Sequence, residues 1–146
     1  MEIHTSIIID APAFGVWNVL TDLASYHSWN PFIRRIRGEL VRGSRLEMEI
    51  RLADEKMVQL DPVVANVELE RQIAWQGRIS SLFSTEHKMA IEPLTHDRVT
   101  FYQVEKFAGP IVSLVAHKLD AALRKGFEEM NQALKSVAER NWNNKQ

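Results

Sequence analysis

Cysteine is absent from this 146-residue sequence. Its absence excludes disulfide bonds, thiolate metal sites and a cysteine nucleophile. Long apolar runs are missing as well, since the longest mostly apolar stretch, residues 110–116, is far short of the ~20 residues that a membrane-spanning helix needs. Residues 1–10 lack the basic segment and the apolar run of a signal peptide. We therefore expect a cytoplasmic protein without a transmembrane segment.

An excess of charge of either sign is also missing. Lysine and arginine number 18, against 19 aspartates and glutamates, so nothing attracts the whole chain to nucleic acid or to an anionic membrane. Arginines are frequent between residues 34 and 51, but glutamates are interleaved with them. That pattern is typical of a solvated sheet face, whereas a nucleic-acid interface would need a coherent basic stripe with aromatic platforms.

Motifs for cofactors and metals are not found either. The sequence contains no zinc-peptidase, dinucleotide-binding, phosphate-loop or serine-hydrolase motif, and its five histidines show no metal-ligand spacing. We therefore expect neither a metal nor a cofactor. The length suits one domain, which we place at residues 1–140, followed by a polar tail at 141–146 in which only Trp142 is expected to fold back onto the domain.

Apolar and polar residues alternate over residues 3–9, which predicts a first strand. Two short helices follow, one with Phe14, Trp17 and Leu20 on its apolar face and one around residues 22–27. Six strands are expected next. The clearest covers residues 45–52, where apolar and charged residues alternate strictly. Others are predicted at residues 63–69, 73–77, 83–92 and 98–107.

The apolar spacing lengthens to three and four residues after Gly109-Pro110 and predicts one amphipathic helix from about residue 110 to about residue 138. A helix of that length has to cover its apolar side with a sheet. The predicted fold class is therefore α+β: a seven-stranded antiparallel curved sheet wrapped around a long C-terminal helix, with two short helices after the first strand.

Several short motifs occur in an order that covers nearly the whole chain. They are Ile9-Asp10-Ala11-Pro12, Val16-Trp17-Asn18-Val19-Leu20-Thr21-Asp22, Trp29-Asn30-Pro31-Phe32, Trp75-Gln76-Gly77, Glu86-His87, Glu105-Lys106-Phe107-Ala108-Gly109 and Gly126-Phe127-Glu128-Glu129-Met130-Asn131. In these motifs the sequence resembles the START-like, helix-grip (SRPBCC) superfamily, and within it the bacterial polyketide cyclase/dehydrase-like branch.

That superfamily includes lipid and sterol carriers, plant hormone-binding proteins, aromatic polyketide cyclases, coenzyme Q-binding proteins and chaperone activators. Its members share a cavity between sheet and helix and have no common catalytic set. The resemblance therefore implies a cavity for a small apolar or amphipathic ligand. Among the residues expected to line it are the apolar side chains Trp75, Phe83, Met89, Phe101, Leu119, Leu123 and Phe127.

Four polar residues share the phase of the apolar positions in the two strands at 83–92 and 98–107. They are Thr85, His87, Gln103 and Glu105. If Pro93 pairs with Val99, His87 faces Glu105, and a slip of two residues makes it face Gln103 instead. In either register we expect a hydrogen bond from the imidazole to the residue that it faces.

Three roles remain open for this polar pair: a structural hydrogen bond inside the core, orientation of a ligand's polar group, or acid–base catalysis by His87 and Glu105. Three functions of the whole protein are considered. The sequence favours a binding or carrier protein for a lipid-, polyketide- or isoprenoid-like molecule. Cyclase- or dehydratase-like catalysis is less favoured, because no further nucleophile or cofactor motif accompanies the pair. A protein-interaction or chaperone-regulator module is the third, and it would need no polar groups inside.

Overall fold

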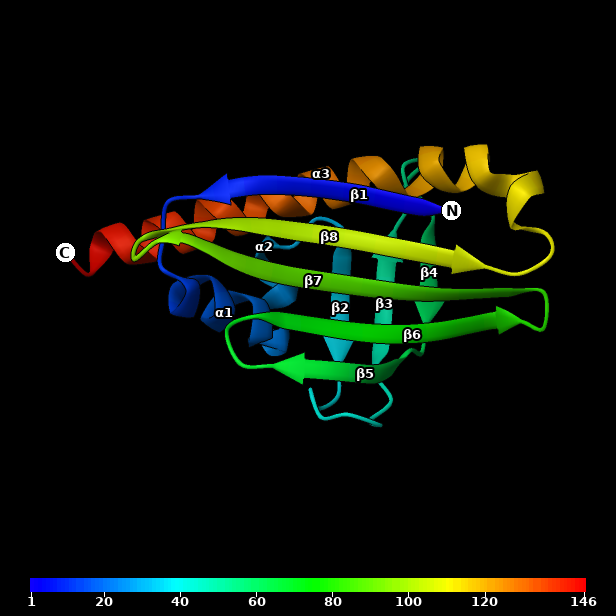
Figure 1. Cartoon of the computed structure of the whole chain (residues 1–146), viewed down its shortest axis with the longest axis horizontal. Coiled ribbons are helices and arrows are strands. Elements are labelled where there is room, and N and C mark those ends of the chain that lie inside the picture. Colours follow the sequence, from blue (N-terminus) through cyan, green and yellow to red (C-terminus); the bar gives the residue numbers. More distant parts are fainter.

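A computed structural model describes residues 1–146, with the exception of the side chain of residue 79. The elements follow the predicted order of strand, short helices, strands and one long helix (Figure 1). In chain order they are β1 (Glu2–Ile9), α1 (Ala13–Thr21), the 3₁₀ helix η1 (Leu23–Ser25), α2 (Tyr26–Trp29), β2 (Ile33–Arg37), β3 (Glu47–Arg51), β4 (Met57–Leu60), β5 (Val63–Glu68), β6 (Gln72–Ser80), β7 (Phe83–Thr95), β8 (Arg98–Ala108) and α3 (Val112–Asn144).

The predicted antiparallel sheet is divided in two, so the expectation of seven strands in one sheet is wrong. The larger sheet has the order β1-β8-β7-β6-β5, and the smaller one has the order β2-β3-β4. A single bridge between Arg45 and Val63 lies between them. Figure 1 shows β2, β3 and β4 behind the larger sheet and running steeply across it. The two sheets together form the curved wall of a helix-grip fold.

Two of the eight strands fall outside the ranges that the sequence indicated, and local structure explains why. In β2 the register shifts between Ile33 and Arg35, so its buried residues Ile33 and Ile36 are three apart instead of two. A bulge of this kind hides a strand from a search for strict alternation. The other strand, β4, has only four residues, and none of them is fully buried.

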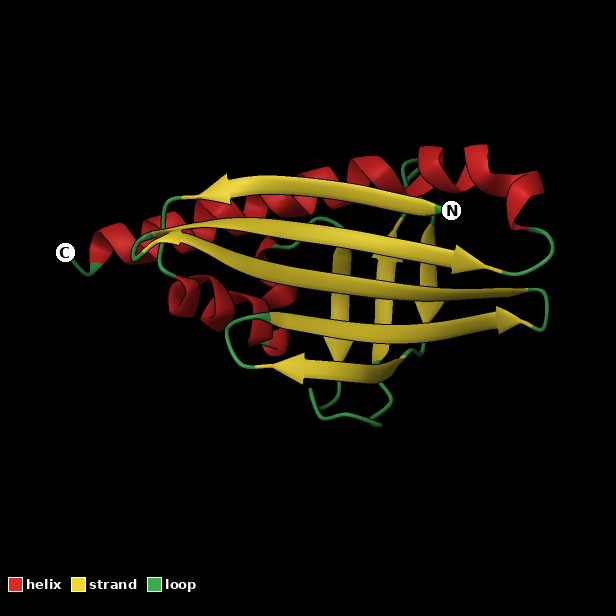
Figure 2. Cartoon of the chain, in the orientation of Figure 1, coloured by secondary structure: helices red, strands yellow, loops and turns green.

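The C-terminal helix α3 is continuous and extends farther than predicted, from Val112 to Asn144. It lies behind the larger sheet along β1 (Figure 2), and it packs mainly on β1 and α1. Residues 141–144 continue the helix, and Trp142 contacts Phe14 of α1 with ring centroids 6.0 Å apart. The segment predicted to be a polar tail is therefore helical as far as Asn144.

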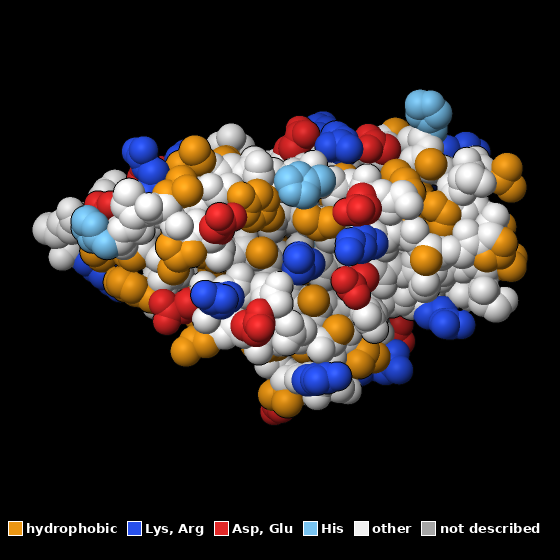
Figure 3. Space-filling model, viewed as in Figure 1, with side chains coloured by type: hydrophobic (Ala, Val, Ile, Leu, Met, Phe, Trp, Pro, Cys, Tyr) orange, Lys and Arg blue, Asp and Glu red, His pale blue; other side chains and the backbone are white. Residues whose placement is uncertain are grey.

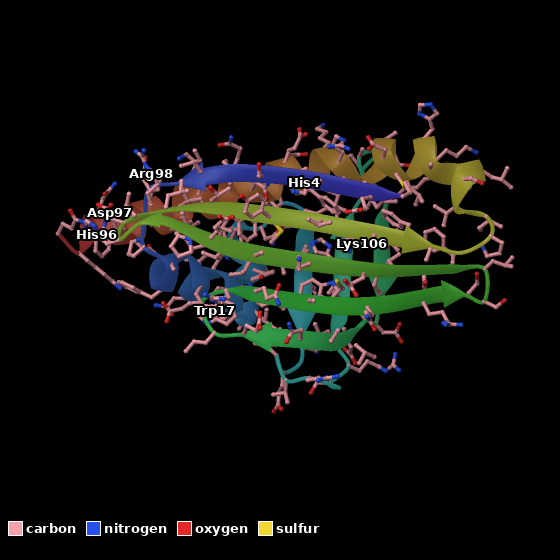
Figure 4. The ribbon with its side chains drawn as sticks, in the orientation of Figure 1. His4, Trp17, His96, Asp97, Arg98 and Lys106 are labelled. Atoms are coloured by element: carbon pink, nitrogen blue, oxygen red, sulfur yellow. The ribbon has the colours of Figure 1, made fainter. Side chains whose placement is uncertain are left out.

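The outer face of the larger sheet is exposed and carries both signs of charge. Acidic and basic side chains are interspersed over it (Figure 3). His4 of β1 and Lys106 of β8 lie on this face, while His96, Asp97 and Arg98 lie at the turn between β7 and β8 (Figure 4). The apolar faces of the sheets and of α3 meet on the opposite side, where they form one buried core.

Candidate functional site

A row of directly opposed residues crosses the inner face of the larger sheet from β1 to β5. It consists of Ile3, Glu105, His87, Trp75 and Val64. Residues directly opposite in antiparallel strands point to the same side of the sheet. Since the three apolar members are at most 4% exposed, the whole row faces the core. The pairing therefore holds two titratable side chains among buried apolar ones.

The structure decides between the two registers that the sequence left open. Pro93 pairs with Val99 and His87 with Glu105, and the alternative slip of two residues does not occur. The adjacent inward row contains Thr5, Gln103, Met89 and Ile73. Gln103 is thus the diagonal neighbour of His87 on the same face, within reach of a long side chain.

His87 forms its hydrogen bond with this diagonal neighbour. Its Nε2 lies 2.9 Å from Oε1 of Gln103. The Gln103 amide nitrogen donates to the backbone carbonyl of Phe127 at 3.2 Å and to Oδ1 of Asn131 at 2.7 Å, and Asn131 Nδ2 donates to Oγ1 of Thr5 at 3.0 Å. All four side chains are at least nine-tenths buried. The network therefore connects β7, β8, β1 and α3 inside the core.

The Phe127 carbonyl fixes the direction of every bond in this network. A carbonyl can only accept, so the Gln103 nitrogen has to face it and Gln103 Oε1 has to face His87. Nε2 of His87 therefore carries a hydrogen and donates it. In the neutral imidazole the other nitrogen, Nδ1, is then an acceptor with a lone pair.

The other imidazole nitrogen of His87, Nδ1, lies 3.1 Å from Oε2 of Glu105. This carboxylate oxygen is buried and has no hydrogen-bond partner among the described residues. The short distance between Nδ1 and Oε2 is not by itself a hydrogen bond, because hydrogen bonds weaken steeply as they depart from linearity. The unslipped register thus brings His87 within ion-pair distance of Glu105 as expected, but the hydrogen bond of the imidazole forms with Gln103.

Two aromatic rings pack against the imidazole of His87. The His87 ring centroid lies 5.5 Å from that of Trp75 and 5.1 Å from that of Phe127. Phe127 in turn packs edge-on against Phe32, at 5.2 Å and 81°. Polar groups in such apolar surroundings interact strongly with any partner, and they are costly when unpaired. An unpartnered acceptor here is therefore the feature of the core that most needs an explanation.

The eleven residues predicted to line a cavity lie on or beside this core. Eight are buried: Trp75, Phe83, His87, Met89, Phe101, Gln103, Leu123 and Phe127. Three are partly exposed: Thr85, Glu105 and Leu119. Sequence reasoning missed Asn131 and Thr5 as members of the network. The available signal was phase, since Thr5 lies on the same face of its strand as Ile3 and Ile7, and Asn131 lies one helical turn after Phe127.

Two open pockets lie away from these residues. A groove of about 800 Å³ is lined by η1, α2 and the strands of the smaller sheet, and it includes Arg35, Arg37, Glu47 and Glu49 from the arginine-rich segment. A second, of about 630 Å³, lies between β1 and α3. None of the eleven predicted residues lines either pocket. An interior ligand cavity therefore stays a prediction.

Two further properties of the described residues bear on the site. Among them there is no cluster of three or more histidine, cysteine, aspartate or glutamate side chains that could hold a metal ion. No helix in the described part of the chain is long and apolar enough to cross a membrane.

Solved structures with the same fold have little sequence in common with this chain. The ZhuI aromatase/cyclase from Streptomyces sp. R1128 superposes with a TM-score of 0.81 at 16% identity, over 97% of this chain and 94% of that one. A START superfamily protein from Mycobacterium smegmatis gives 0.67 at 17% identity, over 99% of both chains. A point mutant of norcoclaurine synthase from Thalictrum flavum, in complex with a transition state analogue, gives 0.74 at 12% identity, over 97% and 95%.

The structural likeness establishes the fold alone, since all three identities are below 25%. No curated protein matches the chain significantly in sequence. The sequence profile described as "Polyketide cyclase / dehydrase and lipid transport" matches residues 1–139. Because that match covers nearly all of the chain, the protein belongs to the polyketide cyclase/dehydrase and lipid transport family.

Proposed function

We propose that this chain binds a small, largely apolar molecule between the larger sheet and α3, with the polar end of the molecule at His87 and Glu105. One observation carries the proposal: Oε2 of Glu105 is buried, lies beside a buried histidine and has no hydrogen-bond partner among the described residues. Leaving such a group unpaired costs about 1–3 kcal/mol, and more when it is charged. A ligand that satisfies the oxygen removes that cost.

The surroundings favour an apolar body for the ligand. Trp75, Phe83 and Phe127 are buried next to the polar pair or on the same inner face, and ligand sites of this kind combine an apolar lining with a few polar groups. We therefore expect a lipid-, polyketide- or isoprenoid-like molecule. The lipid transport named in the family description, and the START superfamily protein of the same fold, agree with a binding or carrier role.

Entry is expected along the N-terminal half of α3. Ile111, Val115, Leu119 and Ala122 pack against the core but remain partly exposed, whereas Phe127, Met130 and Leu134 farther along the helix are at most 1% exposed. The core is therefore covered less completely at the start of α3. A ligand that separates this end from the sheet breaks fewer buried contacts than one entering elsewhere.

Catalysis of the cyclase or dehydratase type is the second candidate. The acceptor nitrogen Nδ1 of His87 could remove a substrate proton, with the Glu105 carboxylate 3.1 Å away to stabilise the imidazolium. The likeness in fold to an aromatase/cyclase is compatible with this role. In this role the His87→Phe variant would bind the molecule but leave it chemically unchanged, and mass spectrometry of the mixture would detect the difference.

Native mass spectrometry of protein purified from cells tests the binding proposal directly. We expect a co-purifying small molecule in the wild type and less of it in His87→Phe. The exposed His96, at the turn between β7 and β8, provides the matched control, and His96→Phe should retain the molecule. Protein that carries no molecule, and that takes up none when incubated with lipids, sterols and aromatic polyketides, would contradict the proposal.

A further inference from the structure

The fixed direction of the hydrogen-bond network determines what the polar end of a ligand has to be. The Phe127 carbonyl orients Gln103 and Gln103 orients His87, so in the neutral imidazole Nδ1 is an acceptor that lies 3.1 Å from Oε2 of Glu105. Glu105 contributes a carboxylate oxygen to the same spot. With His87 neutral, two acceptors therefore meet there, and Oε2 of Glu105 has no hydrogen-bond partner among the described residues.

On this basis, and resting on the proposed function, we infer that the interior site selects a molecule whose polar end donates a hydrogen bond, such as a phenol, an alcohol or an ammonium group, and rejects a carboxylate. A donor placed at Oε2 of Glu105 satisfies the orphaned oxygen. A carboxylate would bring a second negative charge and no proton, and unpaired charge is costly in apolar surroundings.

Small residues lie next to His87 and Trp75 on the inner face of the larger sheet. The inward row next to that of His87 and Glu105 contains Phe107, Thr85 and Gly77. Gly77 has no side chain, and a Cβ atom added to it would come no closer than 3.4 Å to Oγ1 of Thr85. Small residues at two adjacent positions of this row leave the inner face less filled than at Trp75 in the neighbouring row. Thr85 is also only partly buried, and its hydroxyl can accept or donate.

Replacing Glu105 by glutamine is expected to stabilise the free protein. The amide carries no charge, so the cost of a buried carboxylate oxygen without a hydrogen-bond partner is removed. Glu105→Gln should therefore raise Tm by about 3–5 °C. The matched control is Glu2→Gln, which removes the same charge from an exposed position on β1 opposite Lys106 and should leave Tm nearly unchanged.

Three probes of the same size, 2-naphthol, 2-naphthoate and 2-methylnaphthalene, test the inference by calorimetric titration at neutral pH. Naphthol should bind wild-type protein about 10-fold more tightly than either of the others. In Glu105→Gln this preference should fall to less than about threefold, because the free acceptor is lost, while naphthoate should gain affinity. The Glu2→Gln control should keep the wild-type order.

Every other outcome counts against the inference. If naphthoate binds best, if the three probes bind equally, or if the preference survives in Glu105→Gln, then Glu105 is not the acceptor, although interior binding itself would stand. A fall in Tm in Glu105→Gln would show that the oxygen is already paired in the free protein, and it would overturn the inference without any ligand. Failure of all three probes to bind would overturn the proposed function and the inference together.

Discussion

Gly126 of α3 lies directly against the ring of Phe32. A Cβ atom at position 126 would overlap Cδ1 of that ring and come within 2.8 Å of Cε1. The absent side chain lets the segment that leads into β2 approach the helix closely, so that Phe32 packs on Phe127 and Phe127 on His87. Glycine inside this helix is therefore a packing requirement that extends to the candidate site.

Gly126→Ala should destabilise the protein by about 1–3 kcal/mol, because overpacking a filled core forces ring and backbone to shift. Alanine would otherwise be favoured over glycine inside a helix by about 1 kcal/mol. Gly15→Ala in α1 is the matched control, since its nearest neighbour would be 3.7 Å away, and it should be stabilising. Urea denaturation measures the free energy of unfolding of both variants. A gain in stability for Gly126→Ala would contradict the close approach.

Tyr26 should make the protein less stable in alkali. Its hydroxyl donates to the Leu20 carbonyl at 2.5 Å, and complete burial, helped by the nearby charge of Asp22, raises its pKa well above the ordinary 10.0. Above about pH 10 the unfolded chain loses this proton and the folded one keeps it. The free energy of unfolding should therefore fall by up to about 1.4 kcal/mol per pH unit from this residue.

Denaturation of wild type and Tyr26→Phe from pH 8 to 11 isolates this contribution. Tyr26→Phe should be less stable at pH 8, by about 1 kcal/mol for the lost hydrogen bond, and its deficit should shrink as the pH rises. The only other tyrosine, Tyr102, is partly exposed. A deficit that stays constant over this pH range would mean that the Tyr26 phenol ionises equally in both states.

The direction of the core network can be observed by NMR. Long-range ¹H–¹⁵N spectra should show neutral His87 with its hydrogen on Nε2, because that nitrogen faces Gln103 Oε1. Gln103→Glu removes both donors of the amide and should cost about 2–4 kcal/mol, since the Phe127 carbonyl and Asn131 Oδ1 lose their partner. Finding the hydrogen on Nδ1 alone would contradict this direction, because Nε2 could then not donate to Gln103.

Residues 1–140 should fold without the rest of the chain but with reduced stability. Truncation after residue 140 removes Trp142, whose ring packs edge-on against Phe14 at 80°. We expect a loss of about 0.5–1.5 kcal/mol from the aromatic pair, and a similar loss from Trp142→Ala in the full chain. Thermal unfolding of the truncated chain and of Trp142→Ala measures these losses in stability. A truncated chain that does not fold would mean that the end of α3 is an integral part of the domain.

The alternation of side chains along the strands is sufficient to predict much of the site from the sequence. Successive residues of a strand point to opposite faces wherever the strand lies, so His87, Gln103 and Glu105 have to lie on the same side as Phe101 and Met89. The hairpin between β7 and β8 is short, which limits the pairing to two registers. Apolar matching does not select the observed one, in which Met89 faces Gln103 and Phe107 faces Thr85, so only the structure decides between them.

The division of the sheet depends on longer-range structure. Whether neighbouring strands stay hydrogen-bonded depends on how the whole sheet curves over α3, and the bulge between Ile33 and Arg35 adds a local bend to β2. The short β4 has too weak an alternation to be separated from a loop by its residues alone. The number of strands therefore does not follow from periodicity, although the antiparallel, helix-covered character of the fold does.

The sequence by itself determined which side chains face inward, because the two-residue period of a strand and the 3.6-residue period of a helix are properties of the local backbone. Only the tertiary structure decided which of them touch. The position of α3 brings Asn131 to Gln103 and Thr5, and a difference of angle gives the His87 hydrogen bond to Gln103 while Glu105 Oε2 is left without one. Hydrogen bonds depend on tenths of an ångström and on angles, and those are set by the packing of the helix on the sheet.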